Sequence, residues 1–357
     1  MSRTILITAG GTGGHVFPGL AVADALREAG WRVVWLGARN GMEARLVPAR
    51  GYEMAWVRAS ALRGKALLET LLLPLNLLVG FWQSARAILQ HRPDVVLGLG
   101  GYVAFPGGMM ASLLARPLAV HEQNAVAGLT NRILAGVADR VLVAFPGALR
   151  NAEWTGNPVR AEIARLAPPA ERYAGRSGPL QLLVIGGSLG AQALNECVPQ
   201  ALARIPAGER PRVVHQSGEK HLEALRRRYR DAGVEGELLG FIDDMAARYA
   251  AADLVICRAG AITVAELAAG GLPGVLVPFP HAVDDHQSAN AAFLADQGAA
   301  ILLPQSELNP AGLAALIGSL DRVRLLDMAQ KARALGRPDA TRVVAERCIE
   351  LAQGAGA

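Results

Sequence analysis

Several features that mark other classes of protein are scarce or missing in this sequence. The three cysteines among 357 residues, Cys197, Cys257 and Cys348, lie far apart and form no CxxC pair. They exclude a disulfide framework or a zinc motif and are typical of buried thiols in a reducing compartment. There is no run of roughly 20 apolar residues that could span a membrane. No long apolar run precedes the first glycines, so we expect no signal peptide and a cytoplasmic location.

The familiar nucleotide-binding fingerprints are also absent. From Gly11, a GxGxxG motif would require glycine at position 16, which is Val16. From Gly186, it would require glycine at positions 188 and 191, which are Ser188 and Ala191. The second expected strand ends in the residues LGAR (36–39), without the acidic residue of an NAD site, and no GxxxxGK[ST] loop occurs. These absences argue against a dinucleotide fold and a P-loop enzyme.

The chain is long enough for two domains and has enough apolar residues to form a core in each, with 52% hydrophobic residues and a mean hydropathy of +0.25. Short β-branched runs alternate with helical segments, which indicates parallel α/β architecture. A final helix is expected at Thr341–Gln353. Strands are expected at Thr4–Thr8, Val33–Leu36, Glu53–Val57, Asp94–Leu97, Leu118–Val120, Arg140–Val143, Gln181–Ile185, Arg212–His215, Glu237–Phe241, Leu254–Ile256, Val275–Val277 and Ala300–Leu303.

The two halves repeat one pattern, an apolar strand that runs into a glycine loop and then a helix. TILITAGGTGG and LQLLVIGGSLG are one such pair, and VVLGLGGYVAFPGG and LVICRAGAITVAEL are another. Two doubly wound domains facing across a cleft are expected, with ligands beyond the strand C-termini. Backbone N–H groups there attract phosphate, although the glycines could equally serve only tight turns.

Charge is uneven along the chain. Residues 1–158 hold 15 Lys/Arg and 9 Asp/Glu, whereas residues 159–357 hold 21 and 22. A basic first half suits an anionic partner such as lipid headgroups, a pyrophosphate or nucleic acid. A solvated basic surface is the alternative.

Longer blocks carry a specific resemblance that covers nearly the whole chain in order. The blocks are GGTGGHVFPGLAVA (10–23), GLGGYVAFPGG (98–108), HEQNAVAGLTN (121–131), GNPVR (156–160), GGSLGAQALN (186–195), HQSGEK (215–220), GFIDDM (240–245), CRAGAITVAELAAGGLPGVLVPFP (257–280) and DDHQSANA (284–291). In these blocks the chain resembles glycosyltransferase family 28, and within it the UDP-GlcNAc:lipid I N-acetylglucosaminyltransferases of peptidoglycan synthesis. Two positions depart from the family pattern, Leu189 in place of a common glutamine and Ala259 in place of a common serine.

The resemblance implies a GT-B fold, which is α/β with two Rossmann-like domains of doubly wound parallel sheet. Residues 1–158 would form the acceptor and membrane-facing domain, and residues 159–337 the UDP-GlcNAc domain. The terminal helix at about 338–357 would pack back on the first domain. The implied reaction is an inverting transfer of GlcNAc from UDP-GlcNAc to the MurNAc 4-hydroxyl of undecaprenyl-linked lipid I, forming the β-1,4 bond of lipid II.

The family also implies roles for donor-site residues. The Glu266 carboxylate would take the two ribose hydroxyls of UDP, and Arg160, after the GNPVR hinge, would reach the nucleotide. Ser188 would contact phosphate, and a backbone amide at Ile242 would read the uracil. The helix that carries Glu266 would hold the diphosphate at its N-terminal N–H groups. The residues implied there are Ala261, Ile262, Thr263, Val264 and Ala265.

Gln287 and Asn124 would hold GlcNAc hydroxyls, since amides both donate and accept hydrogen bonds. The first glycine loop would add Thr12, Gly13 and Gly14 to the substrate site. His15, at the end of this loop, is the candidate base for the MurNAc 4-hydroxyl, because histidine titrates near the working pH. Glu122 and His121 are rival candidates for the same role.

No metal or other cofactor is expected. The chain has no DxD triplet, and the adjacent pairs Asp243-Asp244 and Asp284-Asp285 lack that spacing. The departing diphosphate should therefore be stabilised by helix N-termini and by Ser188.

The segment Ala66–Gly80, ALLETLLLPLNLLVG, is too short to span a membrane and is flanked by Arg58, Arg63, Lys65 and Arg86. It suits the surface of an anionic cytoplasmic leaflet, or it is an ordinary buried helix. We expect a peripheral protein on the cytoplasmic face of the inner membrane. UDP-GlcNAc and lipid I are the expected partners, with other cell-wall synthesis or division proteins as further candidates and no nucleic acid.

Two other functions compete with this hypothesis. A UDP-GlcNAc 2-epimerase, or another nucleotide-sugar enzyme, would share the two-domain plan. A non-catalytic polyprenyl pyrophosphate binder is the second alternative, but it would have no use for Glu266 and Gln287.

Overall fold

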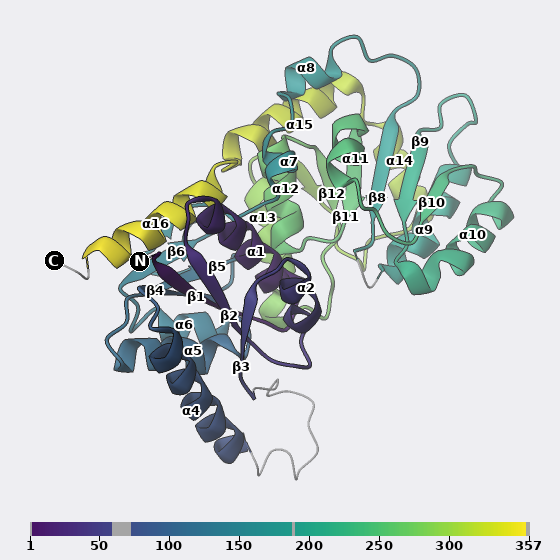
Figure 1. Ribbon diagram of the computed structural model, residues 1–357. Helices are drawn as coiled ribbons and strands as arrows, with labels where there is room; N and C mark the ends of the chain where they lie inside the picture. Colours follow the sequence, from purple (N-terminus) through teal and green to yellow (C-terminus); the bar gives the residue numbers. More distant parts are fainter. Residues whose placement is uncertain (1, 59–72, 188–189, 355–357) are drawn as a thin grey trace. The chain divides into compact units, whose positions relative to one another are not determined.

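The computed structural model describes residues 2–58, 73–187 and 190–354 (Figure 1). The chain forms two compact units, one made of Met1–Val159 with Asp339–Ala357 and the other of Arg160–Pro338. Each unit is built around its own parallel β-sheet.

The first unit holds a seven-stranded sheet in the order β3-β2-β1-β4-β5-β6-β7, with every pair of neighbours parallel. Strand order reverses next to β1, as in doubly wound folds, and ligands of such folds bind beyond the strand ends at this point. The strands are β1 (Thr4–Ala9), β2 (Arg32–Gly37), β3 (Glu53–Trp56), β4 (Val95–Gly100), β5 (Leu118–Glu122), β6 (Arg140–Val143) and β7 (Glu153–Trp154).

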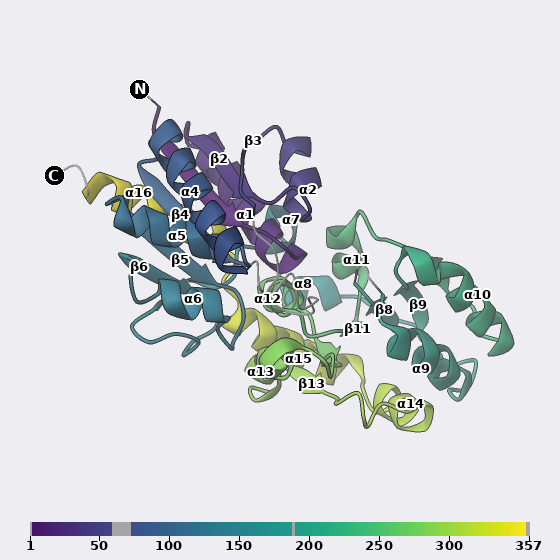
Figure 2. The ribbon, with the colours of Figure 1, turned by 90° about the horizontal axis from the view of Figure 1, so that it is seen from below.

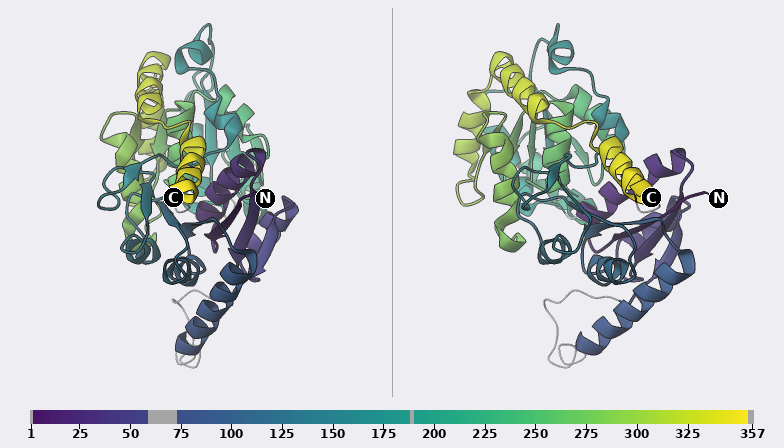
Figure 3. Two further views of the ribbon diagram at one scale, coloured as in Figure 1. Left: turned by 60° about the vertical axis from the view of Figure 1, so that its left-hand side comes forward. Right: turned by 90° about the vertical axis from the view of Figure 1, so that its left-hand side faces the viewer.

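Helices cover both faces of this sheet, so β1 is apolar at every position except its threonines. Ile5 and Ile7 pack with residues of α1 and α16, whereas Leu6 packs on the opposite face with residues of α4 and α5. The final helix α16 lies beside α1 (Figure 3), and α4 lies along α5 (Figure 2). The helices are α1 (Gly13–Glu28), α2 (Glu43–Ala49), α4 (Leu73–His91), α5 (Ala104–Leu113), α6 (Leu129–Leu134) and α16 (Ala340–Gly354).

The second unit holds a six-stranded parallel sheet in the order β10-β9-β8-β11-β12-β13. Its strands are β8 (Gln181–Ile185), β9 (Arg212–Gln216), β10 (Glu237–Leu239), β11 (Leu254–Cys257), β12 (Gly274–Leu276) and β13 (Ala300–Leu302). Its helices are α7 (Ala161–Ala164), α8 (Pro169–Tyr173), α9 (Gln192–Ala203), η1 (Glu219–His221), α10 (Leu222–Asp231), α11 (Met245–Ala251), α12 (Ala261–Gly270), η2 (Val283–Asp285), α13 (His286–Ala295), α14 (Pro310–Gly318) and α15 (Arg322–Leu335).

The twelve expected strands are all present, and their ends differ from the expected ones by at most three residues, the largest difference being the end of β4 at Gly100 instead of Leu97. The strand β7 was not expected, because two residues at a sheet edge leave no periodic pattern. The expected end of β5 at Val120 was too early. His121 and Glu122 continue the strand because their neighbours on β6, Leu142 and Val143, extend the pairing.

The apolar segment Ala66–Gly80 is only partly described. Residues 66–72 lie outside the described residues, and the remainder opens α4. Within the described ranges, every helix falls short of the length and apolarity needed to cross a bilayer.

Candidate functional site

Two glycine loops of the first unit meet backbone to backbone. Gly101 has a φ of +78°, and a Cβ placed there would lie closer than 3.0 Å to the carbonyl oxygen of Gly10. Only glycine tolerates both the conformation and the approach. The loops after β1 and β4 are therefore held together at the strand C-termini.

A buried carboxylate, Glu43, anchors the first of these loops. It is 0% exposed, and its two oxygens accept the backbone N–H groups of Gly11 and Ala38, each at 3.0 Å. Sequence reasoning missed this residue. Its only signal is the three glycines, Gly10, Gly37 and Gly41, whose lack of side chains makes room for it.

His15 stands on the first turn of α1, directly after the loop. Thr12 is the N-cap, and its carbonyl accepts the N–H group of His15 at 3.1 Å. The imidazole Nδ1 lies 2.7 Å from Oε1 of Gln123, and the ring lies against Gly100, where a Cβ would come within 3.0 Å of its Cε1. The ring is therefore held on two sides, at the start of a helix whose first N–H groups belong to Gly13 and Gly14.

The rival candidates His121 and Glu122 are both buried at the end of β5. Nε2 of His121 lies 2.9 Å from the carbonyl oxygen of Gly156, and burial lowers the pKa of His121 to about 4. Oε2 of Glu122 accepts from the Nδ2 amide of Asn131 at 2.9 Å and the N–H group of Gly128 at 3.2 Å. Both side chains are therefore bound within the protein.

Asn124 lies in the loop that Glu122 organises. Its backbone N–H and its Nδ2 amide both donate to Oε1 of Glu122, at 2.8 and 3.2 Å. The carboxylate therefore orients the amide that was expected to hold a sugar hydroxyl.

In the second unit, the loop after β8 also depends on glycine. Gly187 and Gly190 have φ values of +77° and +78°, and a Cβ at Gly190 would overlap the carbonyl oxygen of Ser217. Ser188, expected to contact phosphate, lies outside the described residues. Beneath the loop, His215 lies 3.1 Å from Oδ1 of Asn195, and burial lowers its pKa to about 3.

Glu266 and Arg160, expected at the donor site, are brought together. Glu266 is 5% exposed, and its Oε1 accepts from Nε and Nη2 of Arg160 at 3.1 and 3.0 Å. Its Oε2 accepts from the hydroxyl of Tyr249 at 3.2 Å. Burial raises the pKa of Glu266, and the Arg160 guanidinium opposes that rise. Arg160 compensates a carboxylate that would otherwise be costly to bury.

The helix α12 that carries Glu266 begins without a side-chain cap. Gly260 is its N-cap and has no side chain to accept the N–H groups of the first turn. The uncapped N–H groups belong to Ala261, Ile262 and Thr263, and such a helix end is suited to a phosphate. Val264 and Ala265, the other expected residues of this helix, lie within its first and second turns.

Gln287 stands on the first turn of α13, where its Oε1 accepts the N–H group of Phe279 at 2.9 Å. This bond fixes the orientation of its side-chain amide. The preceding Asp284 and Asp285 both have positive φ, 53° and 49°. Ile242, expected near the uracil, is 3% exposed in the loop between β10 and α11, so its backbone and not its side chain is suited to recognition.

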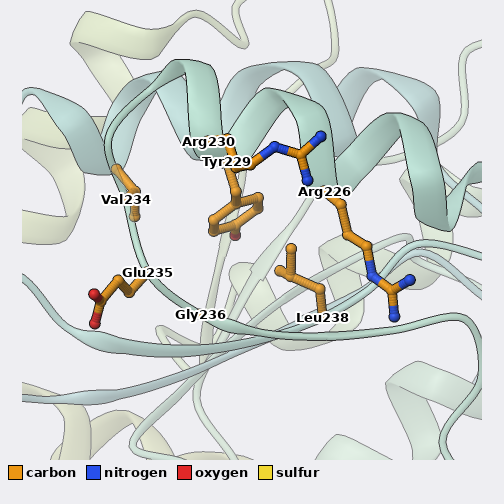
Figure 4. A pocket seen from close by; sticks show the side chains of 7 residues that line it. All are labelled: Arg226, Tyr229, Arg230, Val234, Glu235, Gly236 and Leu238. Carbon is orange, nitrogen blue, oxygen red and sulfur yellow. The ribbon is translucent and has the colours of Figure 1, made fainter.

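A hollow of about 420 Å³ lies elsewhere in the second unit, between α10 and the segment that leads to β10 (Figure 4). None of the expected site residues lines it, and Arg226, at its edge, is paired with Glu223. Its lining residues are Arg226, Tyr229, Arg230, Val234, Glu235, Gly236 and Leu238. Over the described part of the chain, no cluster of three histidine, cysteine or acidic residues has the geometry of a metal site.

Both units match models of a known protein family. Residues 5–143 match the glycosyltransferase family 28 N-terminal domain, and residues 181–344 match the glycosyltransferase family 28 C-terminal domain. The chain belongs to glycosyltransferase family 28. Its two parallel sheets are those of a GT-B glycosyltransferase, so the expected fold class is confirmed.

Relatives and solved structures are similar along nearly the whole chain. An Aromatoleum aromaticum protein is 68% identical over 99% of both chains, and one from Nitrosospira multiformis is 64% identical over 98% of this chain and 99% of its own. Both are described as UDP-N-acetylglucosamine--N-acetylmuramyl-(pentapeptide) pyrophosphoryl-undecaprenol N-acetylglucosamine transferase.

The crystal structure of Acinetobacter baumannii MurG has a TM-score of 0.88 and 42% identity, and the match covers 98% of this chain and 99% of that one. A Listeria monocytogenes structure assigned to the UDP-N-acetylglucosamine 2-epimerases has a TM-score of 0.65. It is 15% identical and covers 96% of this chain and 95% of its own, so it shares the fold alone.

Proposed function

We propose that this enzyme transfers GlcNAc from UDP-GlcNAc to the MurNAc 4-hydroxyl of undecaprenyl-linked lipid I, forming lipid II. The observation that carries the proposal is the 68% identity, over 99% of both chains, to a relative described as that transferase. The UDP-GlcNAc 2-epimerase hypothesis has weaker support, because the Listeria protein is only 15% identical.

For the donor, we propose that the Glu266 carboxylate binds the ribose hydroxyls of UDP. Its Oε1 accepts two bonds from Arg160, whereas its Oε2 accepts a single bond from Tyr249 among the contacts of the described residues and keeps a second lone pair for a ribose hydroxyl. The first N–H groups of α12 face the diphosphate, with Arg160 and Ser188 as further contacts. The backbone of Ile242 reads the uracil.

For the sugar, we propose that Gln287 and Asn124 hold GlcNAc hydroxyls. Each amide has one end fixed by the protein, Gln287 through the Phe279 N–H group and Asn124 through Glu122. A pre-oriented amide loses less conformational entropy when it binds a ligand. Thr12, Gly13 and Gly14 of the first glycine loop contribute further contacts to UDP-GlcNAc.

For the base, we propose His15. The MurNAc 4-hydroxyl oxygen attacks the anomeric carbon, the bond from that carbon to the UDP oxygen breaks, and the hydroxyl proton passes to His15. Attack from the face opposite the leaving group converts the α-linked donor into a β-linked product. His121 and Glu122 suit the role less well, because their polar atoms are occupied by the chain itself.

For localisation, we propose peripheral attachment to the anionic cytoplasmic leaflet of the inner membrane through α4. Leu75, Leu78 and Trp82 are 58%, 66% and 61% exposed on this helix, although apolar side chains of this size are usually buried. Arg86 lies over the Trp82 ring at 5.7 Å, so a cation accompanies the apolar surface.

The proposal is tested by UDP release from UDP-GlcNAc with and without a lipid I analogue. We expect release that depends on the analogue, together with a disaccharide product. Release without the analogue and with formation of a 2-epimer would support the epimerase instead. Activity is expected to survive EDTA, and a complete loss restored by magnesium or manganese would contradict the metal-independent mechanism.

A further inference from the structure

A chain of hydrogen bonds in the first unit connects the backbone at Gly156 to the ring of His15. It runs from the Gly156 carbonyl to His121, from His121 to Gln123, and from Gln123 to His15. Gln123 is 1% exposed and had no expected role. The directions of these bonds can be worked out from atoms whose donor or acceptor character is certain.

The first certain atom is the carbonyl oxygen of Gly156, which can only accept. Nε2 of His121, 2.9 Å away, must therefore carry the proton. Burial lowers the pKa of His121 to about 4, so its ring is neutral near pH 7 and Nδ1 is left as an acceptor.

The second certain atom is the backbone oxygen of His121, which lies 2.8 Å from Nε2 of Gln123. Only the amide nitrogen of Gln123 can face this oxygen. The same nitrogen lies 3.1 Å from Nδ1 of His121, so its two hydrogens have two acceptors. Oε1 of Gln123 is then the atom turned toward His15, and it can only accept.

We propose that Gln123 is a positioning residue that fixes the tautomer of His15. Nδ1 of His15, 2.7 Å from Oε1 of Gln123, is the protonated nitrogen of the neutral ring, and Nε2 carries the lone pair. In the part of the chain that the structure describes, Nε2 of His15 has no hydrogen-bond partner within the protein. Gly100 against Cε1 then holds the ring plane.

The inference rests on the proposed function only in assigning Nε2 as the atom that takes the acceptor proton. A base needs its lone pair in place before the reaction, and a ring in the other tautomer would present an N–H group to the attacking hydroxyl. Gln123 thus acts through His15 and does not touch the reacting atoms.

The decisive measurement is two-bond ¹H–¹⁵N NMR of the histidine rings, with His15 assigned by comparison with His15→Gln. In the parent with a neutral His15 ring, we expect a protonated Nδ1 and an unprotonated Nε2. A protonated Nε2 in the neutral parent ring would overturn the inference, whatever the activity.

Kinetics of Gln123→Met and Gln123→Glu provide the second measurement. Methionine has similar length but cannot accept from Nδ1–H, so we expect a mixed His15 tautomer and a kcat reduced roughly 10- to 100-fold. KM for UDP-GlcNAc should change less than threefold. Glutamate retains the acceptor, so it should restore the Nδ1–H tautomer and raise the pH of the acidic limb of kcat.

Failure of the inference can be distinguished from failure of the proposed base. If His15→Gln loses activity while Gln123→Met keeps both the parent kcat and the parent tautomer, the role proposed for Gln123 is wrong but the assignment of His15 as the base is retained. If His15→Gln keeps the parent kcat, the assignment of His15 as the base is wrong, and so is the catalytic part of the inference. If Gln123→Glu does not fold, the kinetics of Gln123→Met and the NMR spectrum of the parent still test the inference.

Discussion

Arg160 contacts only one carboxylate oxygen of Glu266, because both Nε and Nη2 of its guanidinium donate to Oε1. The other oxygen accepts only a single bond, from Tyr249 at 3.2 Å, among the contacts of the described chain. This monodentate contact neutralises the buried carboxylate and leaves a lone pair on Oε2 for a ligand.

Glu266→Gln should therefore weaken donor binding more than folding. A hydrogen bond to a charged group contributes about 1.5–3 kcal/mol, so we expect the Kd of UDP-GlcNAc to rise roughly 10- to 100-fold by calorimetry. Thermal stability should fall by no more than about 1 kcal/mol, since the amide retains an acceptor for Arg160. Glu162→Gln removes an exposed carboxylate nearby and is the control. Unchanged affinity in Glu266→Gln would contradict the assignment.

Three glycine-to-alanine variants in the second unit separate the cost of a positive φ from the cost of steric overlap between a Cβ and its neighbours. Gly208 has neither a positive φ nor a neighbour within 4 Å of a Cβ, so its variant should be neutral. Gly187 has a φ of +77° but no neighbour within 4 Å of a Cβ, so backbone strain alone should lower the free energy of unfolding of Gly187→Ala by about 1–3 kcal/mol.

Gly190→Ala adds overlap with the Ser217 carbonyl and should destabilise most, with weaker UDP binding because this loop leads into α9. Urea denaturation gives the ranking. Equal stability of the Gly187 and Gly190 variants would show that the loop relaxes.

Two buried histidines predict a loss of stability in mild acid. Burial lowers the pKa of His121 to about 4 and of His215 to about 3, below the value near 6.5 of an unfolded histidine. Below pH 6.5 both histidines become protonated in the unfolded chain, whereas they stay neutral in the folded chain. The free energy of unfolding therefore receives their full contribution above pH 6.5. Each histidine lowers it by about 1.4 kcal/mol per pH unit as the pH falls from 6.5 toward the pKa of that histidine in the folded chain.

Urea denaturation between pH 7.5 and 4.5 measures this slope. His215→Gln should be less stable at pH 7.5, because its contacts with Asn195 and Tyr229 change, but its slope should be shallower by about one proton. The exposed His281 provides the control, since His281→Gln should retain the parent slope. If the free energy of unfolding of His215→Gln changed with pH as steeply as that of the parent, His215 would not be buried in its neutral form.

Replacing Leu75, Leu78 and Trp82 together with serine tests the membrane surface on α4. Burying such side chains contributes about 1.5–3 kcal/mol each, so vesicle partitioning should fall more than tenfold at every salt concentration. Stability should change little, since all three are exposed. Val323→Ser, at an 81% exposed site on α15, is the control. A folded triple variant that binds vesicles like the parent would place the attachment surface elsewhere.

The proposed site residues divide by how local their signals are. Glu266, Gln287 and His15 lie in blocks that resemble the family, and this resemblance was enough to single them out. Glu43 and Gln123 had no such signal, because their importance comes from partners that are distant in the chain, as in the His15–Gln123 pair, 108 positions apart.

By itself, the sequence determined every strand except the two-residue β7, the glycine turns and the doubly wound fold class, since continuous apolar runs and left-handed turns are properties of neighbouring residues. Only the tertiary structure decided that Arg160 meets Glu266 across 106 positions, and that the Gly156 carbonyl acts on His15 through two side chains. The order of strands in each sheet decides which loops become neighbours. Hydrogen-bond direction then depends on distances that no local pattern encodes.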